Sequence, residues 1–218
     1  MSDNLEKQGV RASAKEETKR RIIQSGIKSF AHCGYHGTKV LSITQDANVA
    51  NGTFYLHFKD KQALYLEIIR LAVAKLASGI FAAHSISGSA EDKERAEIKV
   101  VVKFAESNRD LMRIAVESLT AQIPVAADLF KPLMNIREAE LKAGISSGNI
   151  SSRIHPLIAA RAEIGMILSV VCWWQENSHE VSREDVIETL VQLRKGWSVS
   201  DQPLDDIDSL LSQWDSRL

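Results

Sequence analysis

Apolar residues recur every three or four positions along almost the whole of this 218-residue chain. This spacing gathers them on one face of a helix, whereas the strict alternation typical of β-strands is nearly absent. Polar stretches interrupt the pattern, most clearly at 84–90 and 144–152. The sequence therefore predicts an all-α fold whose helices are separated by short connections.

The composition is that of a soluble globular protein, with 44% hydrophobic and 25% charged residues. Cys33 and Cys172 lie far apart and form no CxxC motif, so we expect two reduced core residues and no disulfide. The polar N-terminus lacks the apolar segment of a signal peptide. The longest charge-free apolar stretch, 164–174, is shorter than the roughly 20 residues of a membrane span. We therefore expect a cytoplasmic protein that does not bind a membrane.

The first quarter of the chain predicts three helices after a flexible arm at 1–12. The first helix is expected to begin at Ser13, because an acidic residue three positions later completes a capping box. Gly34 is expected to end it, as glycine commonly does. Thr38 is a candidate cap for a second, short helix, and a third runs from about 51 to 58.

A long fourth helix is expected after Asp60, a residue type that commonly caps helices. Its predicted inward residues are Leu64, Ile68, Leu71 and Leu76. The helix at 155–177 is apolar around nearly its whole circumference, which predicts burial on several sides. The predicted helices from the fourth onward cover about 61–84, 91–106, 109–122, 126–143, 155–177, 182–197 and 203–215.

The stretch 34–64 has the layout of a helix-turn-helix, with two short helices joined by a tight turn between two longer ones. Asn48 stands in the turn, and asparagine tolerates the left-handed conformation that such a turn needs. Val49, Phe54 and Phe58 are expected to pack inward. The opposite face of the third helix is then polar, and it can contact phosphates and base edges in the major groove of DNA.

The remaining expected DNA contacts surround this third helix. Free N–H groups near Thr38 and Lys39 favour an anion, and Lys61 adds a charge at the start of the fourth helix. The first 61 residues carry ten Lys or Arg and six Asp or Glu, which gives this segment a charge of +4. Because the whole chain has a net charge of −1, the remaining residues carry −5. A basic segment on an acidic remainder favours contact with a polyanion. The full set of predicted DNA-binding residues is Thr38, Lys39, Ser42, Asn51, Gly52, Thr53, Tyr55, Leu56, His57 and Lys61.

The same stretch resembles the DNA-binding signature of the TetR family of transcriptional regulators. The matching residues are Gly34, Tyr35, Thr38, Val40, Ile43, Ala47, Val49, Gly52, Thr53, Tyr55, His57, Phe58, Lys61 and Leu64. The chain departs from the pattern at Thr44, at Asn48 in place of the turn glycine, and at Ala50-Asn51 in place of Ser-Lys. Loss of a Ser cap costs about 1 kcal/mol unless Asn51 replaces it. We expect these changes to affect operator sequence and affinity.

The resemblance implies a three-helix DNA-binding domain at 13–60 and a larger helical effector-binding and dimerisation domain at 61–218. It implies a homodimer that binds a palindromic operator, with half-sites ~34 Å apart, as a repressor that a small-molecule effector releases. Dimerisation is expected through the helices at about 155–177 and 182–197. The alternative is that these two helices pack only within their own chain.

An apolar or aromatic effector is expected in the C-terminal domain, although each candidate lining residue can equally be plain core. These candidates are Met112, Phe130, Met134, Met166, Trp173 and Trp174. The histidines are scattered, which predicts no metal site, and we expect no cofactor. No nucleophile elbow, phosphate loop or HExxH motif occurs, so an enzyme is not expected. The alternative function is a helical dimeric enzyme or interaction module that has lost operator binding, which the Ala50-Asn51 change would favour.

Overall fold

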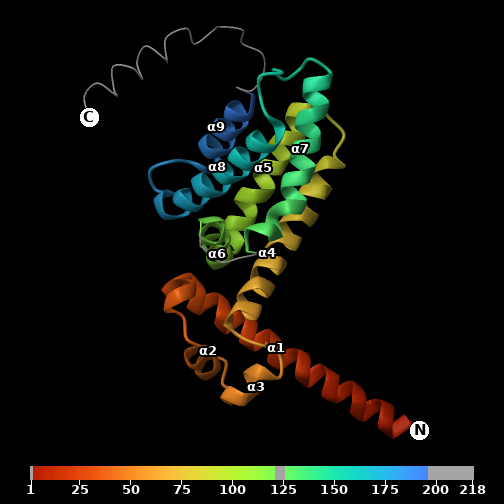
Figure 1. The fold of residues 1–218 in the computed structure, drawn as a ribbon, viewed down its shortest axis with the longest axis vertical. Helices are drawn as coiled ribbons and strands as arrows, with labels where there is room; N and C mark the ends of the chain where they lie inside the picture. Colours follow the sequence, from red (N-terminus) through yellow and green to blue (C-terminus); the bar gives the residue numbers. More distant parts are fainter. Residues whose placement is uncertain (1, 121–125, 196–218) are drawn as a thin grey trace.

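The computed structural model describes residues 2–120 and 126–195, and every regular element in this part of the chain is helical (Figure 1). The elements are α1 (Ser2–Gly37), α2 (Val40–Asp46), α3 (Asn51–Tyr55), α4 (Lys61–His84), α5 (Ala90–Ser107), α6 (Arg109–Thr120), the 3-10 turn η1 (Ala127–Phe130), α7 (Lys131–Ser146), α8 (Pro156–Asn177) and α9 (Arg183–Lys195). The prediction of an all-α fold is confirmed. The helix expected at 203–215 lies outside the described residues.

The helices form two groups that α4 connects (Figure 1). The first group contains α1, α2 and α3 and lies at one end of the molecule, and α5 to α9 form the larger group. α4 packs against α1 near its start and against α5 and α6 in the larger group. A displacement of α4 therefore changes its packing against both groups of helices.

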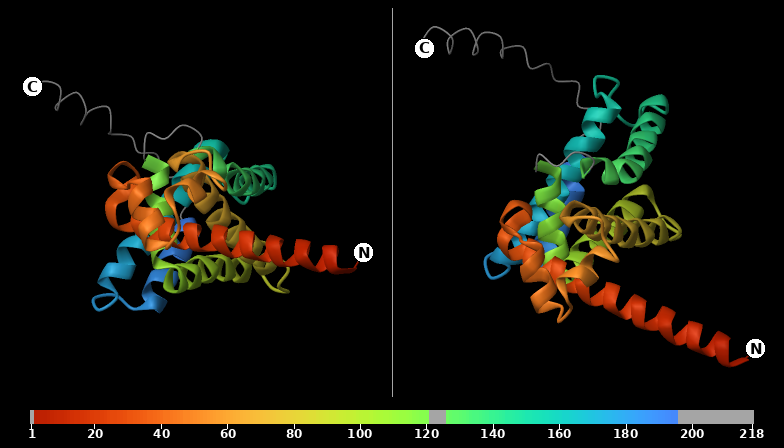
Figure 2. Two further views of the ribbon diagram at one scale, coloured as in Figure 1. Left: turned by 90° about the horizontal axis from the view of Figure 1, so that it is seen from below. Right: turned by 60° about the horizontal axis from the view of Figure 1, so that its bottom comes forward.

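α1 begins earlier than the sequence predicted. Residues 2–12 are helical instead of forming a flexible arm, so Ser13 lies inside the helix and does not cap it. This segment is rich in Leu, Glu, Lys, Gln, Arg and Ala, which are all strong helix formers. Its first turns project away from the rest of the molecule (Figure 2). The break at Gly34 is as expected, with φ +67° and ψ 174°.

The start of α4 follows its predicted cap. The Asp60 side chain accepts a hydrogen bond from the backbone N–H of Ala63 at 2.8 Å. Along α4 the prediction is wrong at Leu71, whose side chain is 46% exposed. The buried face is centred near Tyr65 and Ala72, and adjacent residues differ by about 100° around a helix axis. Leu71 therefore points away from the core.

The larger group is built around α8, which packs against α5, α6, α7 and α9. By length and mean hydropathy (1.6) α8 could cross a membrane, but the core helices of soluble proteins pass the same test. Cys172 on α8 is half-buried, whereas Cys33 on α1 is exposed, which corrects the expectation of two core cysteines. Cys33 lies in the last turn before the Gly34 break, on a side that no described helix covers.

Candidate nucleic-acid interface and ligand pocket

The turn between α2 and α3 is held in place by α1. Asn48 has a φ of 51°, the left-handed conformation that the sequence predicted for this turn. Arg21 on α1 donates a hydrogen bond to the carbonyl oxygen of Ala47 at 3.2 Å. Ser25 on α1 donates one to the carbonyl oxygen of Ile43 in α2 at 2.8 Å. The orientation of α2 and α3 is therefore fixed by buried and half-buried polar contacts as well as by packing.

α3 is a short helix that buries one face and exposes the other. Phe54 and the following Phe58 are buried, as predicted, and the residue that precedes the helix is Ala50, which offers no side-chain cap. Asn51 is the first helical residue, so it does not replace the missing cap. A Cβ atom added to Gly52 would meet nothing within 4 Å, so the chain itself does not require glycine there.

Most of the predicted DNA-binding residues lie on the surface of this unit. Tyr55 and Leu56 have exposed fractions of 53% and 76%. Thr53 and His57 are half-buried. The exposed members of the set are Lys39, Ser42, Asn51, Gly52, Tyr55 and Leu56. α2 and α3 lie at the end of the molecule away from α5 to α9, where nothing in the described chain covers them (Figure 1).

Two predicted phosphate contacts instead hold the junction between α1 and α2. Thr38 is buried and donates its hydroxyl hydrogen bond to the carbonyl oxygen of Gly34 at 2.7 Å, so it does not cap α2. The Lys61 ammonium donates to the carbonyl oxygens of Tyr35 at 2.6 Å and Thr38 at 2.8 Å. It also lies over the Tyr35 ring, 4.6 Å from the centroid. Both residues position the unit formed by α2 and α3, which we call the recognition unit. Sequence alone did not reveal this role because the partners of Thr38 and Lys61 are backbone atoms.

His57 occupies a setting that disfavours its charged form. Burial and the nearby cations Lys15 and Lys19 lower the pKa of the imidazole from its ordinary value of 6.5. His57 is therefore neutral at pH 7, and its ring nitrogens supply one donor and one acceptor.

A cavity of about 80 Å³ lies between α4, α5, α7 and α8. Its apolar walls come from Leu76, Ile80, Ile98, Val101, Phe130, Leu133, Ile136, Ile164, Ile167 and Leu168. A wider hollow of about 460 Å³ adjoins it, and the two share His84, Glu97, Arg137, Glu140 and Arg194 in their linings. The combination offers an apolar chamber with a charged mouth.

The predicted pocket residues are mostly elsewhere, and only Phe130 of the six lines this cavity. Met112, Met134 and Trp174 are buried in the core, and the Trp174 indole donates to the carbonyl oxygen of Val181 at 2.9 Å. Met166 is half-buried, and Trp173 is 48% exposed. Large apolar residues mark a core in sequence, but the position of an empty space depends on how the helices cross.

The charged end of the cavity was not predicted at all. Glu163 on α8 is 1% exposed and accepts from Arg137 on α7 in a two-pronged contact. Burial opposes the charge on Arg137, but the hydrogen bonds that it donates to Glu163 and Glu140 raise the pKa of its guanidinium. Burial raises the pKa of the neighbouring Glu94. The available signal was Glu163, which precedes the charge-free apolar stretch 164–174 within the predicted helix at 155–177.

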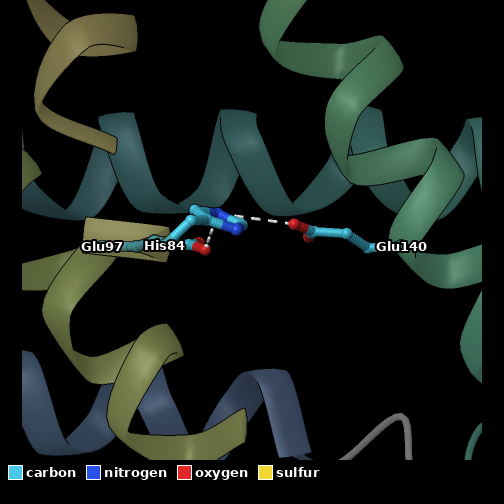
Figure 3. Close-up of side chains that lie close together, drawn as sticks. All are labelled: His84, Glu97 and Glu140. Atoms are coloured by element: carbon cyan, nitrogen blue, oxygen red, sulfur yellow. Dashed lines mark ion pairs between the residues drawn. The ribbon is translucent and has the colours of Figure 1, made fainter. Parts of the chain in front are cut away.

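The other residues of this cluster are His84, Glu97, Glu140 and Arg194, and His84 lies between the two carboxylates (Figure 3). The histidines are scattered along the sequence, but the fold brings His84 into contact with Glu97 and Glu140. These residues come from four different helices, which explains why spacing along the chain did not reveal them.

A second set of contacts joins the larger group to the end of α1. Glu117 on α6 accepts a hydrogen bond from the backbone N–H of Tyr35 at 3.1 Å, next to the Gly34 break. The buried ring of Tyr65 on α4 packs against Phe30 and Tyr35, with ring centroids 5.0 Å apart in both pairs. α4 and α6 therefore both reach the recognition unit.

Comparison with known proteins places these features in context. Residues 22–68 match the family model of "Bacterial regulatory proteins, tetR family". The chain is 24% identical over 179 residues to the fatty acid metabolism regulator protein of Bacillus subtilis, covering 79% of this chain and 91% of that protein. It is 24% identical over 188 residues to the transcriptional activator FasR of Mycolicibacterium smegmatis, covering 84% of this chain and 83% of that protein.

Solved structures share the fold. The fatty acid degradation regulator FadR from Bacillus halodurans superposes with a TM-score of 0.70 at 20% identity, covering 82% of this chain and 95% of that one. FadR from Bacillus subtilis, solved in complex with stearoyl-CoA, gives a TM-score of 0.67 at 22% identity. This match covers 80% of this chain and 96% of the FadR chain. Both similarities extend over the two helical groups, well beyond the helix-turn-helix.

Proposed function

Because this chain belongs to the TetR family of bacterial transcriptional regulators, we propose that it binds operator DNA as a homodimer and leaves it when a small molecule fills the cavity. The observation that carries this proposal is the course of α4. This one helix begins beside the recognition unit at Lys61 and lines the cavity with Leu76 and Ile80. The relatives named above are regulators, which favours this function over an enzyme or interaction module. Such a regulator works in the cytoplasm, where the DNA is.

We assign DNA reading to the exposed face of α3. Asn51 and Tyr55 offer polar groups to bases and phosphates, and the open space at Gly52 allows close approach of the DNA backbone. Lys39, which directly precedes α2, and Ser42 on α2 add exposed polar groups beside this face. Thr38 and Lys61 support it from behind. We propose that the DNA-binding domain ends at residue 60 and that the effector domain begins at 61, where α4 starts.

We assign dimerisation mainly to α8. Its outward face is exposed in the single chain and combines apolar and small residues: Leu157, Ile158, Ala162, Ser169 and Trp173. Gly165 lies in the middle of this face, and a Cβ atom added there would meet nothing within 4 Å. Glycine inside a helix costs roughly 0.5–1 kcal/mol relative to alanine. Close approach of a second copy of α8 would supply a reason for it.

α9 contributes less to this interface than the sequence predicted. Its apolar residues Val186, Ile187, Leu190 and Val191 are buried within their own chain, where α9 packs against α5 and α8. Leu193 remains 48% exposed and can extend the interface. Trp197, the last residue of the predicted helix at 182–197, lies outside the described residues.

We propose an effector with a flexible apolar chain, because the chamber is apolar and its mouth is charged. The chamber of about 80 Å³ is smaller than typical ligand pockets of roughly 300–1,000 Å³. An entering chain must therefore push α4, α5, α7 and α8 apart. Since α4 carries the recognition unit, such a ligand binds best to a state in which α3 no longer fits the operator. The stearoyl-CoA bound by the Bacillus subtilis regulator makes long-chain acyl compounds the first probes.

The deciding experiment selects genomic fragments of the source organism with the purified protein and sequences them. We expect enrichment of a palindrome and an affinity that falls steeply with salt. Tyr55→Phe is expected to weaken all sites similarly, whereas Asn51→Ala is expected to relax preference at one position. Weak binding that is indifferent to sequence, before and after removal of bound lipids, would contradict the proposal.

A further inference from the structure

Three potential metal ligands converge at the mouth of the cavity (Figure 3). His84 is the last residue of α4, Glu97 lies on α5 and Glu140 on α7. The His84 Nε2 atom is in contact with Glu97 Oε1 and lies 3.4 Å from Glu140 Oε1. One ligand atom from each residue falls within 4.8 Å of the other two.

Each of the two carboxylates is anchored through its other oxygen. Arg194 donates to Glu97 Oε2 at 2.8 Å, and Arg137 donates to Glu140 Oε2 at 3.0 Å. The side chains of these arginines are only 4% and 13% exposed. Both Oε1 atoms are thereby turned toward His84. Outer partners of this kind orient the ligands of metal sites in proteins.

The cluster contains more carboxylates than guanidinium groups. The His84 Nε2 atom carries at most one hydrogen, so it can donate to only one of the two Oε1 atoms that face it. The carboxylates of Glu94, Glu97, Glu140 and Glu163 outnumber the two guanidinium groups by two. Excess negative charge in a largely buried cluster is costly unless a cation offsets it.

We propose that His84, Glu97 and Glu140 bind one divalent first-row transition-metal ion, with Zn²⁺ as the best fit to the donor set. Imidazole nitrogen and carboxylate oxygen both suit Zn²⁺, at about 2.0–2.2 Å from the ion. Tetrahedral ligands at that radius lie about 3.4 Å apart, which the Nε2 to Glu140 Oε1 distance already matches. A small side-chain rotation brings the remaining pairs to this spacing. All three residues line the wider hollow, from which water or a ligand oxygen would complete the coordination of the ion.

The test measures Zn²⁺ binding to the full chain after dialysis against a chelator, by calorimetry and by visible absorption with Co²⁺ as a probe. We expect one ion per chain and a rise in Tm on binding. His84→Asn and Glu140→Gln are expected to weaken binding by about 100-fold or more, since loss of an outer partner alone costs 10–100-fold. The matched control is His179→Asn, because His179 is exposed and touches only Glu180 among the ion pairs of the described chain.

Two outcomes would overturn the proposal. One is the absence of stoichiometric binding in the unaltered chain. The other is unchanged affinity in folded His84→Asn and Glu140→Gln proteins, as checked by circular dichroism. Operator binding is measured separately in the presence of chelator, so failure of the metal site leaves the proposed DNA-binding function intact.

Discussion

The hydroxyl oxygen of Tyr65 reduces the stability that its well-packed ring contributes to the fold. Its ring is fully buried against Phe30 and Tyr35, but its hydroxyl has no hydrogen-bond partner among the described residues. An unpaired buried hydroxyl destabilises the folded state. We therefore expect Tyr65→Phe to change the free energy of unfolding by less than about 1 kcal/mol, or to raise it. Tyr65→Ala is expected to cost about 3–5 kcal/mol in urea unfolding, because it leaves a cavity. A loss above about 2 kcal/mol in Tyr65→Phe would show that the hydroxyl is paired.

His57 predicts a pH dependence at the residue scale. Its folded-state pKa lies below 6.5, so the unfolded chain binds more protons as the pH falls through this region. The contribution of His57 to stability is thus present above its ordinary pKa and decreases toward lower pH. We expect the free energy of unfolding to fall less between pH 7.5 and pH 5 in His57→Asn than in the unaltered protein. His179→Asn is the control, and an identical slope in all three proteins would refute the assignment.

The break in α1 makes a prediction at the scale of the element. Gly34 combines a φ of +67° with a ψ of 174°, a region essentially restricted to glycine, and an added Cβ would lie 3.1 Å from Glu117 Oε1. We expect Gly34→Ala to lower the free energy of unfolding by about 1–3 kcal/mol. It should also weaken operator binding, because the break sets the angle between α1 and α2. Gly37→Ala is the matched control, since its Cβ would meet only Cys33 at an ordinary 3.4 Å. Equal effects of the two substitutions would contradict this role.

Elements governed by local backbone chemistry were predictable from the sequence. Gly34, Asn48 and Asp60 each have a conformational preference that acts within a few residues. As predicted, Gly34 breaks α1, Asn48 forms the turn after α2, and Asp60 caps α4. The sequence analysis placed the start of α1 at Ser13 because of its capping pattern. It gave too little weight to the helix-forming residues in 2–12, which belong to α1. The cavity was missed for a different reason. Glu163 and Arg194 meet only because α8 and α9 cross, and no local pattern encodes that crossing.

At the scale of the whole molecule, the two helical groups share one continuous core. Phe30 and Tyr65 near the recognition unit belong to the same cluster as Ile98 and Leu168 beside the cavity. Close-packed cores respond to an inserted group by shifting whole helices, because they contain little free volume. A ligand chain that widens the cavity therefore displaces α4, and with it the surface that meets DNA. In a dimer the same displacement changes the spacing of two recognition helices, which a palindrome requires to be fixed.

The dimer itself yields the last prediction. Trp173 is 48% exposed on the outward face of α8, where a second copy would bury it. We expect Trp173→Glu to produce monomers in analytical ultracentrifugation, because an unpaired charge would be buried in the interface. Operator affinity should fall with it, since each monomer then binds one half-site alone. Phe81→Glu is the matched control, because Phe81 is 77% exposed on α4, away from the α8 face, and should leave the dimer unchanged. If the dimer persists in Trp173→Glu but dissociates in Phe81→Glu, the interface lies on the outer face of α4 and the assignment to α8 is wrong.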